Sequence, residues 1–148
     1  MQPVTRRPAR TAFTLIEVLV VVVIIAVLAS IVAPNIFRHV DTARNVTAQA
    51  QIASLGAALD AYRLDNGRYP TTEQGLAALW QAPISEPRPS NWRGPYLRQP
   101  PPADPWGAPF VYRAPGDHMG NGFDLSSLGS DGAPGGTGEG ADITSWKQ

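Results

Sequence analysis

The sequence has no cysteine, only two histidines and no excess of charge of either sign. The absence of cysteine excludes a disulfide framework. The 12 basic and 12 acidic residues balance, which removes any general case for binding nucleic acid or an anionic lipid surface. His39 and His118 stand in dissimilar settings, with no Ser/His/Asp set and no paired-acid cleft, so we expect no enzymatic activity.

Glycine and proline are plentiful by contrast, at 14 and 15 residues, and most of them follow Gly67. This composition predicts a loop-rich second half. A chain of 148 residues with one long apolar segment leaves room for a single modest globular domain.

The apolar segment lies near the N-terminus. Residues 18–33 are all apolar except Ser30, and together with residues 13–16 they are long enough to cross a hydrocarbon core of ~30 Å as a helix. The preceding residues, 1–12, carry three arginines and no acid. By the positive-inside rule this leader stays in the cytoplasm, so the C-terminal side crosses the membrane. We therefore predict a transmembrane helix at residues 13–36.

Glu17 is the one acid inside this segment, where an ionised side chain costs roughly 2.5–3.5 kcal/mol. One interpretation places it near the headgroups, reaching back to water. Alternatively it has a partner, but no Lys or Arg lies one helical turn away on either side. A cut between Ala12 and Phe13 would supply one, because the freed amine of Phe13 would lie one turn from Glu17 of the same chain or of a neighbouring copy.

The string AFTLIE at residues 12–17, after a basic leader and before a long apolar helix, closely resembles the processing site of type IV pilins and pseudopilins. The resemblance implies that a prepilin peptidase cuts before Phe13 and methylates the new amine. It also implies that Glu17 pairs with the amino terminus of the adjacent subunit during assembly. The family usually has Gly where this chain has Ala12; because Ala is the smallest alternative, we expect cleavage to persist.

A removable signal is the rival interpretation of the same segment. Residues 27–29, Val-Leu-Ala, would then form an ordinary signal-peptidase site, leaving Ser30 as the mature N-terminus of a soluble, secreted calcium-binding module. That interpretation gives Glu17 no purpose. Arg6-Arg7 lacks the apolar pattern expected after a twin-arginine signal.

Pro34 interrupts the apolar helix, because it removes the hydrogen bond to the carbonyl of Ser30. Helical spacing nevertheless resumes, which predicts one helix over about residues 13–64, bent near Pro34, with an amphipathic second half that docks on a domain. Asn66-Gly67 is a good C-terminal stop. The apolar positions of that second half are Ile52, Leu55, Leu59 and Tyr62, and the small ones are Ala43, Ala50, Ala53 and Ala57.

Beyond the helix, Thr71 and Gln74 have capping-box spacing and predict a second helix, with Leu76, Leu79 and Trp80 as its apolar face. As strings, residues 64–76 (LDNGRYPTTEQGL), 104–107 (DPWG), 128–132 (LGSDG), 142–143 (DI) and 146 (W) are similar to major pseudopilins of type II secretion systems. Only residues 83–102 read as a variable, Pro-rich loop.

Two short strands are predicted at residues 110–112 and 123–128, paired as a hairpin around the polar turn 117–122. A small antiparallel sheet laid against the long helix is the economical arrangement, so we predict an α+β, pilin-like fold. The larger aromatic residues of this half are expected to be core and loop anchors: Trp92, Tyr96, Trp106 and Trp146.

The Gly-rich loop 128–142 is the candidate metal site, although its spacing is not that of an EF-hand and its composition alone favours a mobile loop. Resemblance to the type II major pseudopilins implies calcium binding here. Position by position it assigns the side chains of Asp131 and Asp142 and the carbonyls of Leu128 and Ala133. The family's further Asp just before Asp142 is missing, which leaves two alternatives: either Thr137 or Glu139 substitutes for it, or the site binds calcium more weakly.

The resemblance implies a structural filament subunit of the inner membrane that helps export folded proteins across the outer membrane. Residues 1–12 would be the leader, 13–36 the transmembrane and assembly helix with Glu17 and Pro34, and 37–148 the periplasmic domain. The expected partners are further copies in a helical filament, minor pseudopilins, the inner-membrane platform and the prepilin peptidase. A type IV pilus subunit is the nearer alternative, disfavoured by the missing cysteines.

Overall fold

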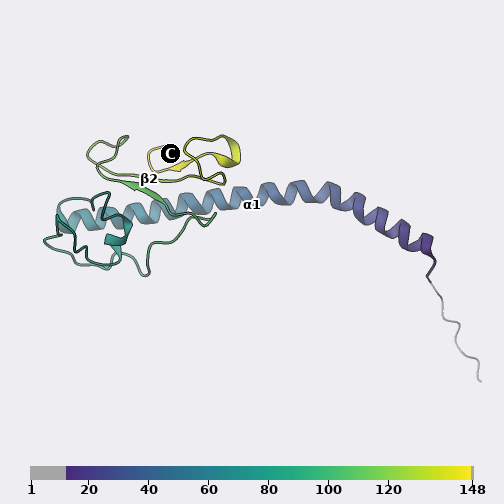
Figure 1. The fold of residues 1–148 in the computed structure, drawn as a ribbon, viewed down its shortest axis with the longest axis horizontal. Coiled ribbons are helices and arrows are strands. Elements are labelled where there is room, and N and C mark those ends of the chain that lie inside the picture. The colour runs from purple at the N-terminus through teal and green to yellow at the C-terminus, as the bar shows by residue number, and fades with distance from the viewer. Residues whose placement is uncertain (1–12, 148) are drawn as a thin grey trace, which may run out of the picture. The chain divides into compact units, whose positions relative to one another are not determined.

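The computed structural model describes residues 13–147, apart from the side chains of residues 31–39 and of Glu139. The element order is α1 (Leu15–Asn66), the 3₁₀ helix η1 (Leu76–Leu79), β1 (Val111–Arg113), β2 (Asp124–Ser127), the 3₁₀ helix η2 (Gly138–Gly140) and β3 (Ile143–Thr144) (Figure 1). The chain divides into two units, with the boundary between His39 and Val40. The predicted leader, residues 1–12 with Ala12, lies outside the described residues.

Helix α1 runs from Leu15 to Asn66. Thr14 caps its start, because the Thr14 Oγ1 accepts a hydrogen bond from the backbone N–H of Glu17 at 3.3 Å. Its end is the predicted one: Gly67 adopts φ 74° and its N–H bonds the Arg63 carbonyl at 2.8 Å, a left-handed C-terminal cap. The helix continues through Pro34. The bend expected there involves residues whose side chains are not described, and it stays a prediction.

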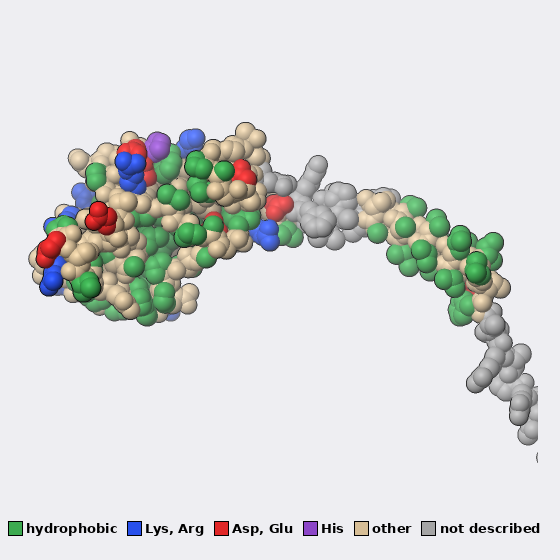
Figure 2. Space-filling model, in the orientation of Figure 1, with side chains coloured by type: hydrophobic (Ala, Val, Ile, Leu, Met, Phe, Trp, Pro, Cys, Tyr) green, Lys and Arg blue, Asp and Glu red, His purple; other side chains and the backbone are tan. Residues whose placement is uncertain are grey.

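The first unit presents its apolar side chains to the outside. The large ones between Phe13 and Leu28 are 49% to 84% exposed, and they cover the visible face of this part of the helix in Figure 2. Within the described part of the chain, no helix meets the length and apolarity required of a membrane span. The span predicted at residues 13–36 includes residues 31–39, whose side chains lie outside that part.

The second unit has a buried core formed by one face of α1, the sheet and η1. The predicted apolar positions of the helix are confirmed, since Ile52, Leu55, Leu59 and Tyr62 are all buried. Ala48 and Ala58 are the alanines of the helix that are buried against the core, whereas Ala43, Ala50, Ala53 and Ala57 are exposed, and close packing of another backbone against them stays a prediction.

The sheet has three antiparallel strands, β1 (Val111–Arg113), β2 (Asp124–Ser127) and β3 (Ile143–Thr144), in that order. Tyr112 pairs with Leu125, and Ser127 pairs with Ile143. Figure 1 shows β2 lying beside the C-terminal half of α1, and the core contains one apolar residue from each strand: Tyr112, Leu125 and Ile143. The predicted hairpin and α+β fold are confirmed; β3 was not predicted.

The predicted second helix is a short 3₁₀ helix. The capping box itself forms, with Thr71 N–H bonded to Gln74 Oε1 at 3.1 Å and Gln74 N–H bonded to Thr71 Oγ1 at 3.2 Å. The helix after this box is only the four-residue 3₁₀ helix η1, Leu76–Leu79. Gly75, at φ 58° and ψ −166°, breaks the helical path immediately after the box.

Two of the predicted aromatic anchors, Trp92 and Tyr96, hold a loop as predicted. Trp92 donates its indole N–H to the Ala78 carbonyl at 3.0 Å, and Tyr96 donates its hydroxyl to Asp65 Oδ2 at 2.9 Å. The two rings meet edge to face, 5.9 Å apart between centroids. They fasten the Pro-rich loop to the end of α1 and to η1.

Candidate functional site

The predicted assembly site lies at the start of α1. Phe13 is 80% exposed, and Glu17 follows one helical turn later. The backbone N–H of Glu17 bonds to Thr14, but its exposed carboxylate has no hydrogen-bond or ion-pair partner among the residues that the structure describes. Within one described chain, the negative charge is therefore uncompensated. Ala12, the other residue of the predicted cleavage site, lies outside the described residues.

The predicted metal loop begins at the end of β2 and ends at the start of β3. Asp131, close to its beginning, accepts a hydrogen bond through Oδ1 from the Ala133 N–H at 3.1 Å. Its other oxygen faces Gly140, where an added Cβ would lie 2.7 Å from Oδ2. A Cβ added to Gly136, which has φ 72°, would lie 3.0 Å from the same Oδ2 and would overlap the Gly140 carbonyl. Glycine at these positions lets the backbone close around the carboxylate.

Asp142 closes the loop from its other end. Its backbone N–H donates to the Gly135 carbonyl at 3.1 Å, and its Oδ2 accepts from the Gly135 N–H at 2.9 Å. Its Oδ1 is buried and has no hydrogen-bond partner in the described part of the molecule. A buried carboxylate oxygen without a donor is under-satisfied, and a cation would satisfy it.

The structure thus brings the two predicted carboxylates, Asp131 and Asp142, onto the same short segment, residues 135–140. The remaining predicted ligands are less clearly placed. Thr137 is exposed at the start of η2 (Gly138–Gly140), and the side chain of Glu139 lies outside the described set. Across the described residues there is no group of three or more His, Cys, Asp or Glu side chains able to hold a metal ion. A cation here would depend on two carboxylates and backbone carbonyls.

Asp104, the first residue of the DPWG string, is a residue whose contacts sequence reasoning missed. Its Oδ1 accepts the N–H groups of Trp106 and Ala108, at 3.1 and 2.8 Å, and closes the turn. Its Oδ2 accepts the hydroxyl of Ser127 at 2.6 Å. Since Ser127 lies 23 residues away, at the end of β2, no local pattern could have revealed the pair.

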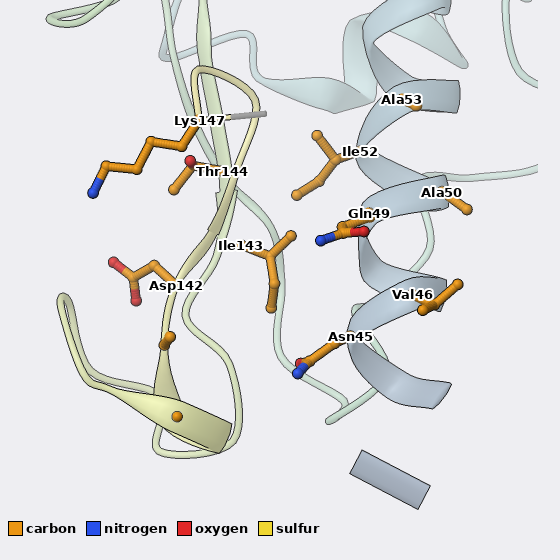
Figure 3. Close-up of a pocket in the computed structure, with 12 residues that line it drawn as sticks. Asn45, Val46, Gln49, Ala50, Ile52, Ala53, Asp142, Ile143, Thr144 and Lys147 are labelled. Carbon is orange, nitrogen blue, oxygen red and sulfur yellow. The ribbon is translucent and has the colours of Figure 1, made fainter. Parts of the chain in front are cut away.

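A groove of about 750 Å³ runs between α1 and the C-terminal segment. Figure 3 shows Ile143 pointing from β3 toward the helix, where Ile52 lies, whereas Asp142 and Thr144 lie on the far side of the strand. Asn45 borders the groove from the helix. The end of the metal loop is therefore connected to helix α1 through the next residue, Ile143, which belongs to the core.

A second buried acid, Asp124, holds the turn between β1 and β2. Its Oδ2 accepts the backbone N–H groups of Asp117 and His118, at 2.9 and 3.1 Å, and contacts Nδ1 of His118 at 2.8 Å. Burial opposes ionisation of this carboxyl, but the hydrogen bonds from His118 and Asp117 outweigh it and lower the pKa of Asp124 below its ordinary value. The His118 ring stacks on Trp146 at 4.1 Å. The cluster fastens the C-terminus to the hairpin.

A long N-terminal helix whose second half packs on a small antiparallel sheet, with a Gly-rich acidic loop before the last strand, defines a pilin-like α+β protein. A solved structure agrees: the crystal structure of the major pseudopilin from the type 2 secretion system of enterohaemorrhagic Escherichia coli superimposes with a TM-score of 0.65. The two chains are 40% identical, and the match covers 78% of this chain and 96% of that one.

Sequence comparison identifies the family. Residues 35–146 match the family described as "Type II secretion system (T2SS), protein G", and residues 7–33 match the prokaryotic N-terminal methylation motif. Type II secretion system core protein G of Pseudomonas aeruginosa is 45% identical, over 95% of this chain and 98% of its own length. That of Vibrio cholerae is 48% identical, over 93% and 92%. The chain belongs to the type II secretion system protein G family.

Proposed function

We propose that this chain is the major structural subunit of a type II secretion pseudopilus, a periplasmic filament that assists the export of folded proteins across the outer membrane. The observation that carries the proposal is the match to core protein G relatives over nearly the whole chain. The role is structural rather than enzymatic. Its partners are other copies of the chain, minor pseudopilins, the inner-membrane platform and the prepilin peptidase.

Maturation comes first in this account. The peptidase cuts between Ala12 and Phe13 and methylates the new amine, and the match to the N-terminal methylation motif supports this step. The same match argues against a removable signal ending at Ala29. Residues 13–36 then anchor the protein in the inner membrane, with the domain in the periplasm, as the apolar sequence and the arginines of the leader favour.

Assembly follows from the helix that one chain leaves exposed. Apolar side chains on the described part of residues 13–30 gain burial when helices of several copies pack together, in a heterologous contact that does not close on itself. Glu17 sets the register, because pairing with the Phe13 amine of a neighbour neutralises a charge that would otherwise remain alone in an apolar surrounding. The Glu17 carboxylate has no ion-pair partner among the described residues, which supports this role.

Calcium orders the loop at residues 128–142. The chemistry of the donors fits a hard cation, because Asp131 and Asp142 offer carboxylate oxygens at the two ends of one Gly-rich segment and the buried Asp142 Oδ1 has no donor among the described residues. The ligands would be these two side chains and the carbonyls of Leu128 and Ala133, with Thr137 or Glu139 in place of the missing acid. Bound calcium would fix the loop and thereby β3 and its core residue Ile143.

The filament itself is the test of this function. The full chain is produced together with a prepilin peptidase and the secretion platform of a bacterium that lacks its own G subunit, and sheared material is examined by electron microscopy. We expect fibres composed of the cleaved chain. Cleaved chain that accumulates in the membrane without forming any fibre, while a protein G relative forms fibres in the same cells, would contradict the proposed function.

A further inference from the structure

Asp104 and Ser127 are buried polar residues that the assembly and calcium proposals leave without a role. Asp104 is 5% exposed and Ser127 is fully buried. A carboxylate with so little access to water needs several donors, and Asp104 has three: two backbone N–H groups of its own turn and the Ser127 hydroxyl. The turn 104–108 is closed further by the Asp104 N–H on the Ala108 carbonyl at 2.8 Å. These hydrogen bonds hold the Asp104 carboxylate in one position.

Ser127 connects the Asp104 carboxylate to the calcium loop. While it donates its hydroxyl proton to Asp104, its Oγ accepts the backbone N–H of Gly129 at 3.3 Å. That N–H belongs to the same peptide group as the carbonyl of Leu128. In a planar trans peptide the N–H and C=O point in opposite directions, so a bond that holds the Gly129 N–H also sets the direction of the Leu128 carbonyl.

The same peptide group lies against the other end of the loop. Gly129 is buried at φ 67°, and a Cβ added to it would lie 2.9 Å from the Ala141 carbonyl oxygen. The residue next to Ala141 is Asp142, the second predicted carboxylate ligand. A rotation of the 128–129 peptide would therefore disturb both ends of the loop at once.

We propose that Asp104 and Ser127 are positioning residues for the calcium loop, which aim the Leu128 carbonyl into the site and increase its basicity. The inference rests on the proposed calcium function. The Asp104 carboxylate accepts a hydrogen bond from the Ser127 hydroxyl, and this makes Oγ a better acceptor for the Gly129 N–H. The stronger Oγ–Gly129 hydrogen bond in turn increases the negative partial charge on the Leu128 carbonyl oxygen, which favours binding of a cation. The DPWG turn thus acts on the metal loop through one serine, without contacting the metal.

Asp124 provides a matched control within the same small sheet. Like Asp104 it is a buried aspartate that accepts two backbone N–H groups, and it is 7% exposed. Its third contact is His118, in the hairpin turn, rather than a residue that bonds to the loop. Asp104→Asn and Asp124→Asn are the same chemical change at two buried aspartates, of which only Asp104 is connected to Gly129. They differ in one respect: both oxygens of Asp104 are hydrogen-bonded, whereas Oδ1 of Asp124 has no partner among the described residues.

The experiment measures calcium affinity by isothermal titration of the full chain in detergent with calcium chloride, at a temperature well below the melting point of every variant in EGTA. We expect Ser127→Ala and Asp104→Asn to raise the Kd about tenfold, the lower end of what loss of a partner behind a metal ligand costs. Asp124→Asn should lower the melting point in EGTA and leave the Kd unchanged. Circular dichroism tests whether each variant is folded. If Ser127→Ala does not fold, the Kd of Asp104→Asn alone tests the positioning role.

Three outcomes overturn the inference, and only the last of them also refutes the proposed calcium site. If the native chain binds calcium and both variants bind it equally tightly, the positioning role is wrong and the calcium site stands. If all three variants weaken binding to the same extent, the effect is general destabilisation. If the native chain binds no calcium, the calcium proposal fails and the positioning role fails with it.

Discussion

The two parts of this chain bury their apolar side chains in different ways. In the second unit Leu55, Leu59 and Tyr62 are buried within one molecule, against the sheet and η1. In the first unit the large apolar side chains of the described residues are 49% to 84% exposed. The core of the domain is thus completed by its own chain, whereas in the proposed function the apolar side chains of the first unit are covered by other molecules, lipid before assembly and neighbouring copies after it. Changes in the two parts should therefore have different consequences.

Loss of the Glu17 charge should have the largest effect. Glu17→Gln keeps the size of the side chain but removes the charge that we propose to pair with the Phe13 amine of a neighbour, so we expect fibres to be nearly abolished while the chain is still inserted and cleaved. Fibre yield in sheared fractions and membrane-bound chain, both measured by immunoblot, check this. Glu73→Gln, an exposed acid in the domain, is the matched control. Normal fibres from Glu17→Gln would refute the charge pair.

A core substitution should act on the domain alone. Leu59 is fully buried, so Leu59→Ala should lower the free energy of unfolding by about 2–5 kcal/mol, the usual cost of a truncated core leucine. Leu19→Ala removes the same atoms from a side chain that is 55% exposed and should leave the unfolding of the domain unchanged. Urea denaturation of the full chain in detergent, followed by circular dichroism, compares them. Equal losses would contradict the division between the two parts.

Calcium should stabilise the domain by a comparable or smaller amount. At a hundredfold excess over the Kd, a ligand that binds only the folded state contributes about 2.7 kcal/mol. Chelation with EGTA should therefore lower the melting point of the native chain, and it should have little effect on Asp131→Asn, which loses a ligand charge. Differential scanning calorimetry with and without EGTA tests this. A native melting point that is insensitive to EGTA would count against the site.

Acid should weaken the domain through Asp124. Because hydrogen bonds lower the folded-state pKa of this carboxyl, its contribution is complete above the unfolded pKa of about 3.9 and is lost as the pH falls toward the lower, folded value. We expect the free energy of unfolding of the native chain to fall more steeply below pH 4 than that of Asp124→Asn. Urea midpoints between pH 3 and pH 6 provide the comparison, and parallel curves would show that Asp124 contributes nothing to the slope.

The smallest effect concerns the leader. The family's usual Gly is replaced by Ala12, which adds one methyl group at the cleavage position. Ala12→Gly should be processed at least as fast as the native chain, as a pulse-chase experiment with the prepilin peptidase would measure. Slower processing would contradict the view that Ala12 is a tolerated departure.

Local patterns predicted much of this structure. The apolar spacing of α1, its stop at Gly67, the Thr71–Gln74 box and the hairpin all depend on residues close together in sequence, and all four are confirmed. The misses have physical reasons. The 3₁₀ helix replaces an α-helix because Gly75 leaves the helical path, and the two-residue strand β3 is too short to show any alternation.

The candidate site was predicted less completely, because its contacts join distant segments. The string containing Asp131 and Asp142 was visible, but nothing in it indicated that Gly136 and Gly140 fold against one carboxylate. The Asp104–Ser127 contact spans 23 residues and is a tertiary interaction between a turn and a strand. Sequence alone marked Asp104 as the first residue of the DPWG string, and only the fold shows that its second oxygen accepts the hydroxyl of Ser127.

The mature N-terminus is the measurement that tests this account most directly. Mass spectrometry of the protein purified from its native envelope should find a chain that begins at Phe13 with a methylated amine. That terminus would supply the positive charge that Glu17 lacks within the described chain and would place the exposed helix in an assembly. A mature chain that still begins at Met1, or one that begins at Ser30 without the helix, would contradict the account.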